Sequence, residues 1–140
     1  MPDKPYIKIY GERNSGTKYL EALIAMNLDV HILRGVETQW VGRQRREWIK
    51  DAFFRYTQDR FLGWKHSVPP TPSILKFQRK RPLLLIFLVK NPYAYLLSLY
   101  RRPWEYKGEL PETFEAFIKS PWATHGRDRL NKRVLLGPVQ

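Results

Sequence analysis

A polar stretch bounded by two glycines, Gly11 to Gly16, holds residues suited to binding a phosphate group. A β-branched and aromatic segment precedes it, and a segment with helical spacing follows from Thr17. Glycines let the backbone turn tightly and approach a ligand, and the first amides of a helix lack intrahelical partners. We therefore expect an anion cradle here. The side chains able to complete it are Arg13, Ser15, Thr17 and Lys18.

Two other interpretations of this loop stay open. The glycine spacing resembles the Walker A loop of P-loop proteins, but Thr17-Lys18 stands where that loop has Lys-Ser/Thr. This order moves the lysine one position around the helix and argues against ordinary Mg-nucleotide geometry. A plain turn before a capped helix is the second alternative.

Two further segments carry chemistry at expected strand ends. Lys90-Asn91-Pro92 follows the apolar run Leu83 to Val89, and Ser98 lies eight residues after Lys90. Gly63-Trp64-Lys65-His66 lies at the end of a strand predicted over Phe61 to Val68. Ligands of open parallel sheets lie beyond the carboxyl ends of the strands, so the three segments are expected to converge. The alternatives are a surface Ser98 and a structural His66 paired with a backbone carbonyl.

The elements that must position these residues alternate between strand and helix. Apolar and β-branched segments predict strands, and periodic spacing predicts helices. The unbroken run from Leu83 to Val89 is typical of a strand covered on both faces. The predicted strands are 6–10, 30–33, 61–68 and 83–89. Helices are predicted to begin at Thr17 and at Pro92 and to cover 43–59 and 111–119. Residues 34–42 are a predicted loop, and 69–82 are a predicted loop with one short helix.

This order predicts a single α/β domain over residues 1–140, with a mainly parallel sheet in a three-layer α/β/α arrangement. Only about four strands are visible, whereas the mean sheet has roughly five to six. The apolar end, Val134 to Gln140, stops abruptly. We therefore expect the chain to lack the C-terminal part of the fold.

Composition limits the possible partners. The formal net charge is +12, from 25 Lys and Arg against 13 Asp and Glu, which favours anionic ligands. The chain has no cysteine, so thiolate catalysis and disulfides are excluded, and a cytoplasmic location is expected. The longest apolar run has seven residues, far fewer than the ~20 that a transmembrane helix needs.

The three segments together resemble the sulfotransferases that use 3′-phosphoadenosine 5′-phosphosulfate (PAPS), as short patches within residues 6–103. Ser15-Gly16-Thr17 and Leu20 match the family's 5′-phosphosulfate loop, which usually reads Pro-Lys-Ser-Gly-Thr-Thr-Trp-Leu, with Asn14 in place of its catalytic lysine. Lys90 and Ser98 resemble the 3′-phosphate segment, and His66 the catalytic base.

The resemblance implies a P-loop-like sulfotransferase fold, PAPS as sulfate donor, no metal, and a small-molecule or glycan acceptor with a hydroxyl or amine. It implies two sets of residues. The donor-binding set is Asn14, Ser15, Gly16, Thr17, Lys18, Lys90 and Ser98, and the catalytic set is His66, Lys18, Arg13 and Lys65. The family's later glycine-rich segment, which grips the adenosine side, is not evident.

Three other functions stay open. A P-loop kinase or NTPase would need an acidic Mg²⁺ partner at a strand end, where this chain has Lys65-His66 and Lys90-Asn91. A basic nucleic-acid-binding protein is suggested by the charge and by interleaved aromatics such as Trp40 and Trp48, although a donor pocket and a core account for both. The third is an inactive remnant of the family. The sequence does not indicate the oligomeric state.

Overall fold

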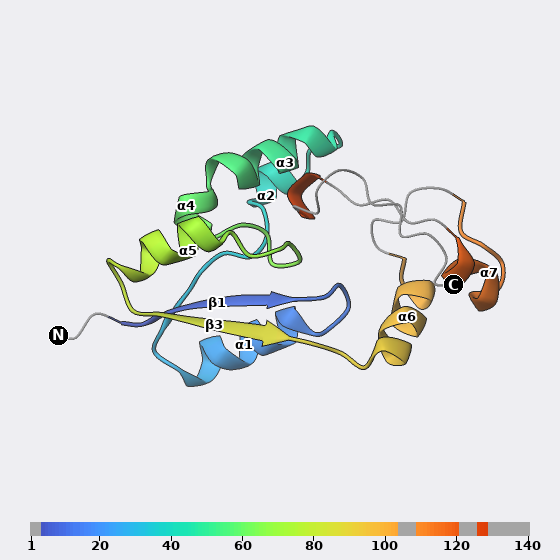
Figure 1. The fold of residues 1–140 in the computed structure, drawn as a ribbon, viewed down its shortest axis with the longest axis horizontal. Helices are drawn as coiled ribbons and strands as arrows, with labels where there is room; N and C mark the ends of the chain where they lie inside the picture. Colours follow the sequence, from blue (N-terminus) through green and yellow to red (C-terminus); the bar gives the residue numbers. More distant parts are fainter. Residues whose placement is uncertain (1–3, 104–108, 121–125, 129–140) are drawn as a thin grey trace.

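The computed structural model describes residues 4–103, 109–120 and 126–128, and within them the fold is α/β. Three parallel strands form one sheet in the order β2-β1-β3 (Figure 1). The strands are β1 (Tyr6–Gly11), β2 (His31–Ile32) and β3 (Leu83–Leu88). The strands predicted over 6–10, 30–33 and 83–89 are therefore confirmed, and each of their ends agrees to within one residue.

Helices occupy both sides of these strands. In Figure 1, α1 lies on one side of β1 and β3, the helices α2 to α5 lie on the other, and α6 follows the carboxyl end of β3. The helices are α1 (Thr17–Asn27), α2 (Gln39–Gly42), α3 (Glu47–Tyr56), α4 (Gln58–Phe61), α5 (Thr71–Gln78), α6 (Pro92–Arg101) and α7 (Phe114–Lys119), with a 3₁₀ turn, η1 (Gly126–Asp128). Among the described residues, none of these helices is long and apolar enough to cross a membrane.

The central strand β1 is covered on both faces. Successive strand residues point to opposite faces, and Ile7 and Ile9 pack with Ile24 of α1 in one apolar cluster. On the other face, Lys8 is fully buried and Tyr10 donates a 2.5 Å hydrogen bond to the Leu62 carbonyl. The sheet is therefore joined to α1 by apolar packing and to the loops opposite by polar contacts.

The polar contacts of Lys8 tie two loops to the sheet. Its Nζ donates hydrogen bonds to the carbonyl oxygens of Arg34 at 2.8 Å, Phe61 at 2.7 Å and Gly63 at 2.6 Å. Burial lowers the pKa of Lys8 to about 7. A lysine in the middle of a central strand thus takes the place that an apolar residue would usually fill.

The segment predicted as a strand over Phe61 to Val68 is wrong, because residues 62–68, all described, form turns instead. Leu62 and Gly63 have φ angles of 59° and 80°, in the left-handed region, which ends α4 and reverses the chain. Only Lys65 then bonds as a strand residue would, donating its N–H to Gly35 and accepting from the Gly11 N–H, both at 2.9 Å. The segment still reaches the carboxyl end of β1.

Other boundaries also differ from the sequence predictions. The helix predicted over 43–59 begins only at Glu47 and is interrupted at Thr57, and the predicted loop 34–42 contains α2, which begins after Thr38. On β3, Leu84 and Phe87 are 55% and 58% exposed, so the described elements cover only part of the strand, contrary to the prediction. The strand pairs only with β1 among the described residues. The predicted apolar end, Val134 to Gln140, lies outside the described residues.

Close contact at the end of β1 leaves no room for a side chain at Gly11. A Cβ there would lie 2.8 Å from the Leu88 carbonyl oxygen and 2.8 Å from Cγ2 of Thr17. We expect Gly11→Ala to lower the free energy of unfolding by about 2 kcal/mol, because the paired strand backbone cannot move away. Urea denaturation would measure it. Gly42→Ala is the control, since its Cβ would meet only a Glu37 side chain at 3.4 Å. Equal stability of the two variants would contradict this account.

Candidate functional site

The loop between β1 and α1 turns through two residues with positive φ. Asn14 has φ 60° and Gly16 has φ 91°, and these are residue types that accept the left-handed region at low cost. The Ser15 hydroxyl donates to the Glu12 carbonyl at 2.6 Å and closes the turn. Thr17 is buried against Gly11, whereas Gly16 and Lys18 are exposed. The loop thus places Gly16 and Lys18, on either side of the first residue of α1, at the molecular surface.

The segment after β3 meets this loop directly. Lys90 Nζ donates a 2.5 Å hydrogen bond to Ser98 Oγ and a 3.4 Å bond to the Asn14 carbonyl. The Asn14 amide in turn donates to the carbonyls of Ser98 at 3.4 Å and Arg102 at 3.2 Å. Asn91 caps α6 by accepting from two amides of its first turn, which sets the helix direction. The structure therefore brings Lys90 and Ser98 next to the glycine loop.

His66 lies at the carboxyl end of β1, although the segment that carries it is not a strand. Its Nδ1 is 2.6 Å from the Gly11 carbonyl oxygen, and its ring meets the Trp64 ring edge-on at 5.0 Å between centroids. A carbonyl oxygen can only accept, so Nδ1 carries the proton and the neutral ring has its lone pair on Nε2. This contact is the one expected of a structural histidine, and the tautomer that it sets is also the one in which Nε2 is the proton-accepting nitrogen.

Positive and negative groups gather around the loop. Burial lowers the pKa of Lys65, and the neighbouring Lys18 ammonium lowers it further. The buried Lys65 side chain packs against Gly35, in the segment between β2 and α2. Burial, and next the Glu12 carboxylate, raises the pKa of Tyr95 on α6 to about 12.

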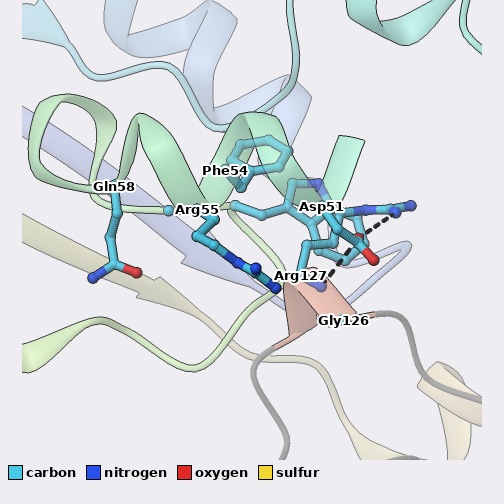
Figure 2. Close-up of a pocket in the computed structure, with 8 residues that line it drawn as sticks. Asp51, Phe54, Arg55, Gln58, Gly126 and Arg127 are labelled. Atoms are coloured by element: carbon cyan, nitrogen blue, oxygen red, sulfur yellow. Dashed lines mark hydrogen bonds and ion pairs between the residues drawn. The ribbon is translucent and has the colours of Figure 1, made fainter. Parts of the chain in front are cut away.

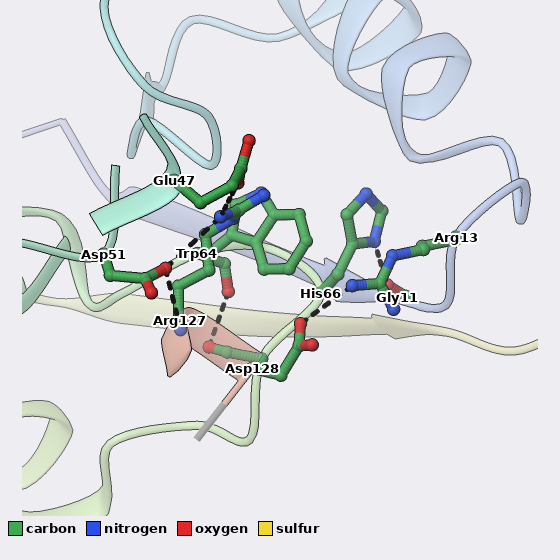
Figure 3. A network of polar contacts seen from close by, with 9 residues as sticks. Gly11, Arg13, Glu47, Asp51, Trp64, His66, Arg127 and Asp128 are labelled. Carbon is green, nitrogen blue, oxygen red and sulfur yellow. Dashed lines mark hydrogen bonds and ion pairs between the residues drawn. The ribbon is translucent and has the colours of Figure 1, made fainter. Parts of the chain in front are cut away.

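Arg13 takes part in a polar network around Trp64. Its guanidinium pairs with Asp128 at 2.9 Å and lies 4.9 Å from the centre of the Trp64 ring (Figure 3). The Asp128 carbonyl also accepts the Val68 N–H at 3.0 Å. The catalytic role that the resemblance implies for Arg13 would require the side chain to leave this pairing.

A second arginine packs on the same tryptophan. The Arg127 guanidinium lies 4.6 Å from the Trp64 ring centre and pairs with Glu47 at 2.6 Å and Asp51 at 3.2 Å on α3. Figure 3 shows both arginines around the indole ring, which is only 4% exposed. Sequence reasoning missed Arg127 and Asp128 because nothing in the sequence links positions 13 and 64 to the chain more than sixty residues later.

A hollow of about 220 Å³ lies beside this network (Figure 2). Trp64 forms part of its wall, and the same ring meets His66 on another side. The lining residues are Asp51, Phe54, Arg55, Gln58, Gly63, Trp64, Gly126 and Arg127. The hollow therefore does not include the glycine loop, Lys90 or Ser98.

Comparisons with known proteins add no relative: no protein-family model, curated protein or solved structure matches this chain. The function is therefore inferred from the residues of the site. Of the residues predicted from the sequence, the structure groups Asn14, Lys90 and Ser98 at one place. It places His66 against Gly11 at the start of the same loop, and Lys65 near Lys18.

Proposed function

We propose that this protein is a sulfotransferase-like enzyme that binds PAPS across the β1–α1 loop and the start of α6. The observation that carries the proposal is the meeting of Lys90, Ser98 and the Asn14 carbonyl. This contact sets a cation and a hydroxyl beside the loop that leads into α1. Because the first amides of a helix have no partners within it, the arrangement favours a ligand with two separate anionic groups. A nucleotide phosphorylated at both its 3′ and 5′ positions has that chemistry.

The residues present suit the two ends of such a donor. The amides after Gly16, with Lys18, would hold the 5′-phosphosulfate, while Lys90 and Ser98 would exchange their mutual bond for the 3′-phosphate. PAPS supplies the sulfuryl group when bound. His66 would accept the proton of the acceptor hydroxyl or amine at Nε2, and the Gly11 carbonyl would hold its ring. Lys18 and Lys65 would stabilise the charge that develops on the departing phosphate.

An Mg-nucleotide kinase or NTPase is less well supported. Lys18 follows Thr17 rather than preceding it, and the residues beyond the ends of β1 and β3 include His66 and Lys90. The Lys90 ammonium repels Mg²⁺, and neither residue supplies the carboxylate oxygens that Mg²⁺ needs.

Calorimetric titration with three nucleotides tests the proposal. We expect adenosine 3′,5′-bisphosphate to bind more tightly than adenosine 5′-monophosphate, and ATP with Mg²⁺ to bind weakest. Ser98→Ala should weaken the bisphosphate about tenfold, the value of roughly one charge-assisted hydrogen bond, and leave the monophosphate unchanged.

Ser120→Ala is the matched control, since that hydroxyl donates to the Phe117 carbonyl at the end of α7. It should alter no affinity. Equal affinities for the monophosphate and the bisphosphate would contradict the binding of a 3′-phosphate by Lys90 and Ser98. Tighter binding of ATP with Mg²⁺ than of the bisphosphate would favour a kinase or NTPase.

A further inference from the structure

A second hollow, lined mainly by basic residues, lies near the end of the sheet opposite the glycine loop. Its volume is about 220 Å³. Its wall includes Arg81, which packs on Tyr6, the first residue of β1, whereas the loop follows Gly11, the last. The six residues of β1 span roughly 17 Å from the first to the last, which separates the two places. The lining residues are Asp59, Arg60, Lys76, Phe77, Lys80 and Arg81.

The charge at this hollow is unbalanced. Four of its six lining residues are cations and one is a carboxylate, Asp59. That carboxylate pairs with Lys76 and accepts a 2.7 Å hydrogen bond from Ser73, and the Lys76 bond holds the pKa of Asp59 below its usual range. Three positive charges at the hollow therefore exceed what its own carboxylate can neutralise.

Aromatic rings hold two of the cations in place. The Arg81 guanidinium lies 5.1 Å from the centre of the Tyr6 ring and donates a 3.1 Å hydrogen bond to its hydroxyl. The Arg60 guanidinium lies 5.0 Å from the centre of the Phe61 ring. Stacking on rings reduces the freedom that an arginine side chain loses on binding a ligand.

The cations come from separate elements. Lys76 lies in the last turn of α5, and Lys80 and Arg81 follow that helix. The negative end of the helix dipole stabilises cations at this place. Arg60 belongs to α4, so the dipole of α5 does not account for it. The contact between α4 and α5 brings both groups to one hollow.

From this geometry we propose that the hollow is a binding site for a phosphate monoester, separate from the nucleotide site. A phosphate monoester carries a charge of about −1.5 to −2 at pH 7 and three acceptor oxygens, which suits the excess of cations and the fork of an arginine. A sulfate monoester carries only one negative charge. The Phe77 ring provides an apolar wall for the carbon skeleton of the ligand.

Calorimetric titration with glucose 6-phosphate, glucose 6-sulfate and glucose tests this site. We expect glucose 6-phosphate to bind best and glucose not to bind at millimolar concentration. Affinity for glucose 6-phosphate should fall as the pH drops below about 6, where the second phosphate oxygen is protonated. Tighter binding of the sulfate ester, or binding of glucose as strong as that of its phosphate, would overturn the proposal.

Two double variants that remove the same charge distinguish binding at the hollow from non-specific electrostatic attraction to the basic chain. Arg60→Gln with Lys80→Gln removes two exposed cations at the hollow, and Arg43→Gln with Arg45→Gln removes two exposed cations elsewhere. We expect the first pair to weaken glucose 6-phosphate at least about tenfold and the second less than about twofold.

Equal losses in the two double variants would show diffuse attraction and overturn the site. The result is separable from the proposed nucleotide site, because Lys18→Gln with Lys90→Gln, which removes one cation at each end of that site, should leave glucose 6-phosphate binding unchanged. Loss of glucose 6-phosphate binding in this double variant would mean that the probe binds at the glycine loop instead.

Discussion

The Lys8→Met variant is expected to lose roughly 3 kcal/mol of unfolding free energy, since hydrogen bonds from a charged donor contribute about 1.5–3 kcal/mol each and desolvation offsets part of them. Three carbonyl oxygens, on two loops, would lose the donor that joins them to β1. Because native domains are stable by only about 5–15 kcal/mol, this is a large fraction. Urea denaturation at pH 6, where most native chains carry the charged ammonium, measures it.

The control for this variant is Lys4→Met, the same substitution at an exposed lysine. Lys4 pairs with Asp29 at 2.5 Å, with side chains 50% and 80% exposed, so its loss should change stability by less than about 0.5 kcal/mol. Similar losses in both variants would show that the three carbonyl contacts do not stabilise the fold.

The stability deficit of Lys8→Met should also widen as the pH rises from 7. The pKa of Lys8 in the fold is about 7, below its ordinary value of 10.5, so between these values the unfolded chain binds a proton that the native chain has released. Wild-type stability therefore rises with pH relative to the variant, by at most about 1.4 kcal/mol per pH unit. A difference that stays constant up to pH 10 would show that the three carbonyls keep the ammonium charged.

The local features of the fold could be predicted from the sequence. Alternation and β-branched residues define β1, the two glycines define the loop, and Asn91-Pro92 defines the start of α6. These signals depend on a few neighbouring residues, which is why the same segments were found without any long-range information.

The features that the sequence did not predict correctly depend on contacts between distant segments. The apolar stretch from Phe61 to Val68 resembles a strand, but Tyr10 and Lys8 on β1 take the carbonyls of Leu62 and Gly63 and stabilise a turn. The pairing of Arg13 with Asp128 joins positions 115 residues apart. Neither contact has a local signature, so the sequence predicted residues of the candidate site but not what holds them.

The strand error does not remove His66 from the candidate site. A strand would have placed the residue at its own carboxyl end, whereas the turn places it at the end of β1, where its ring bonds the Gly11 carbonyl. Both arrangements bring the histidine to the same edge of the sheet. Both the structural and the catalytic interpretation of His66 include the bond from Nδ1 to the Gly11 carbonyl. Only the catalytic interpretation needs Nε2, so a test must change Nε2 and keep the bond from Nδ1.

The His66→Asn variant makes this separation, and we expect it to slow PAPS cleavage roughly a hundred- to ten-thousand-fold. The asparagine amide reaches the position of Nδ1 and can still donate to the Gly11 carbonyl, but it has no group in place of Nε2. With water as acceptor, its oxygen would bond to sulfur as the bond from sulfur to the leaving phosphate oxygen breaks, and Nε2 of wild-type His66 would take the proton. Release of adenosine 3′,5′-bisphosphate from PAPS measures the rate.

Two further readouts distinguish loss of a base from loss of structure. The thermal midpoint and the affinity for adenosine 3′,5′-bisphosphate should remain those of the wild type, because the bond to Gly11 is kept. His31→Asn is the matched control, since His31 on β2 stacks on Tyr6 at the other end of β1. Wild-type turnover in His66→Asn would reduce His66 to a structural residue. If turnover falls and the thermal midpoint falls with it, the site needs the His66 ring for its structure rather than Nε2 as a proton acceptor.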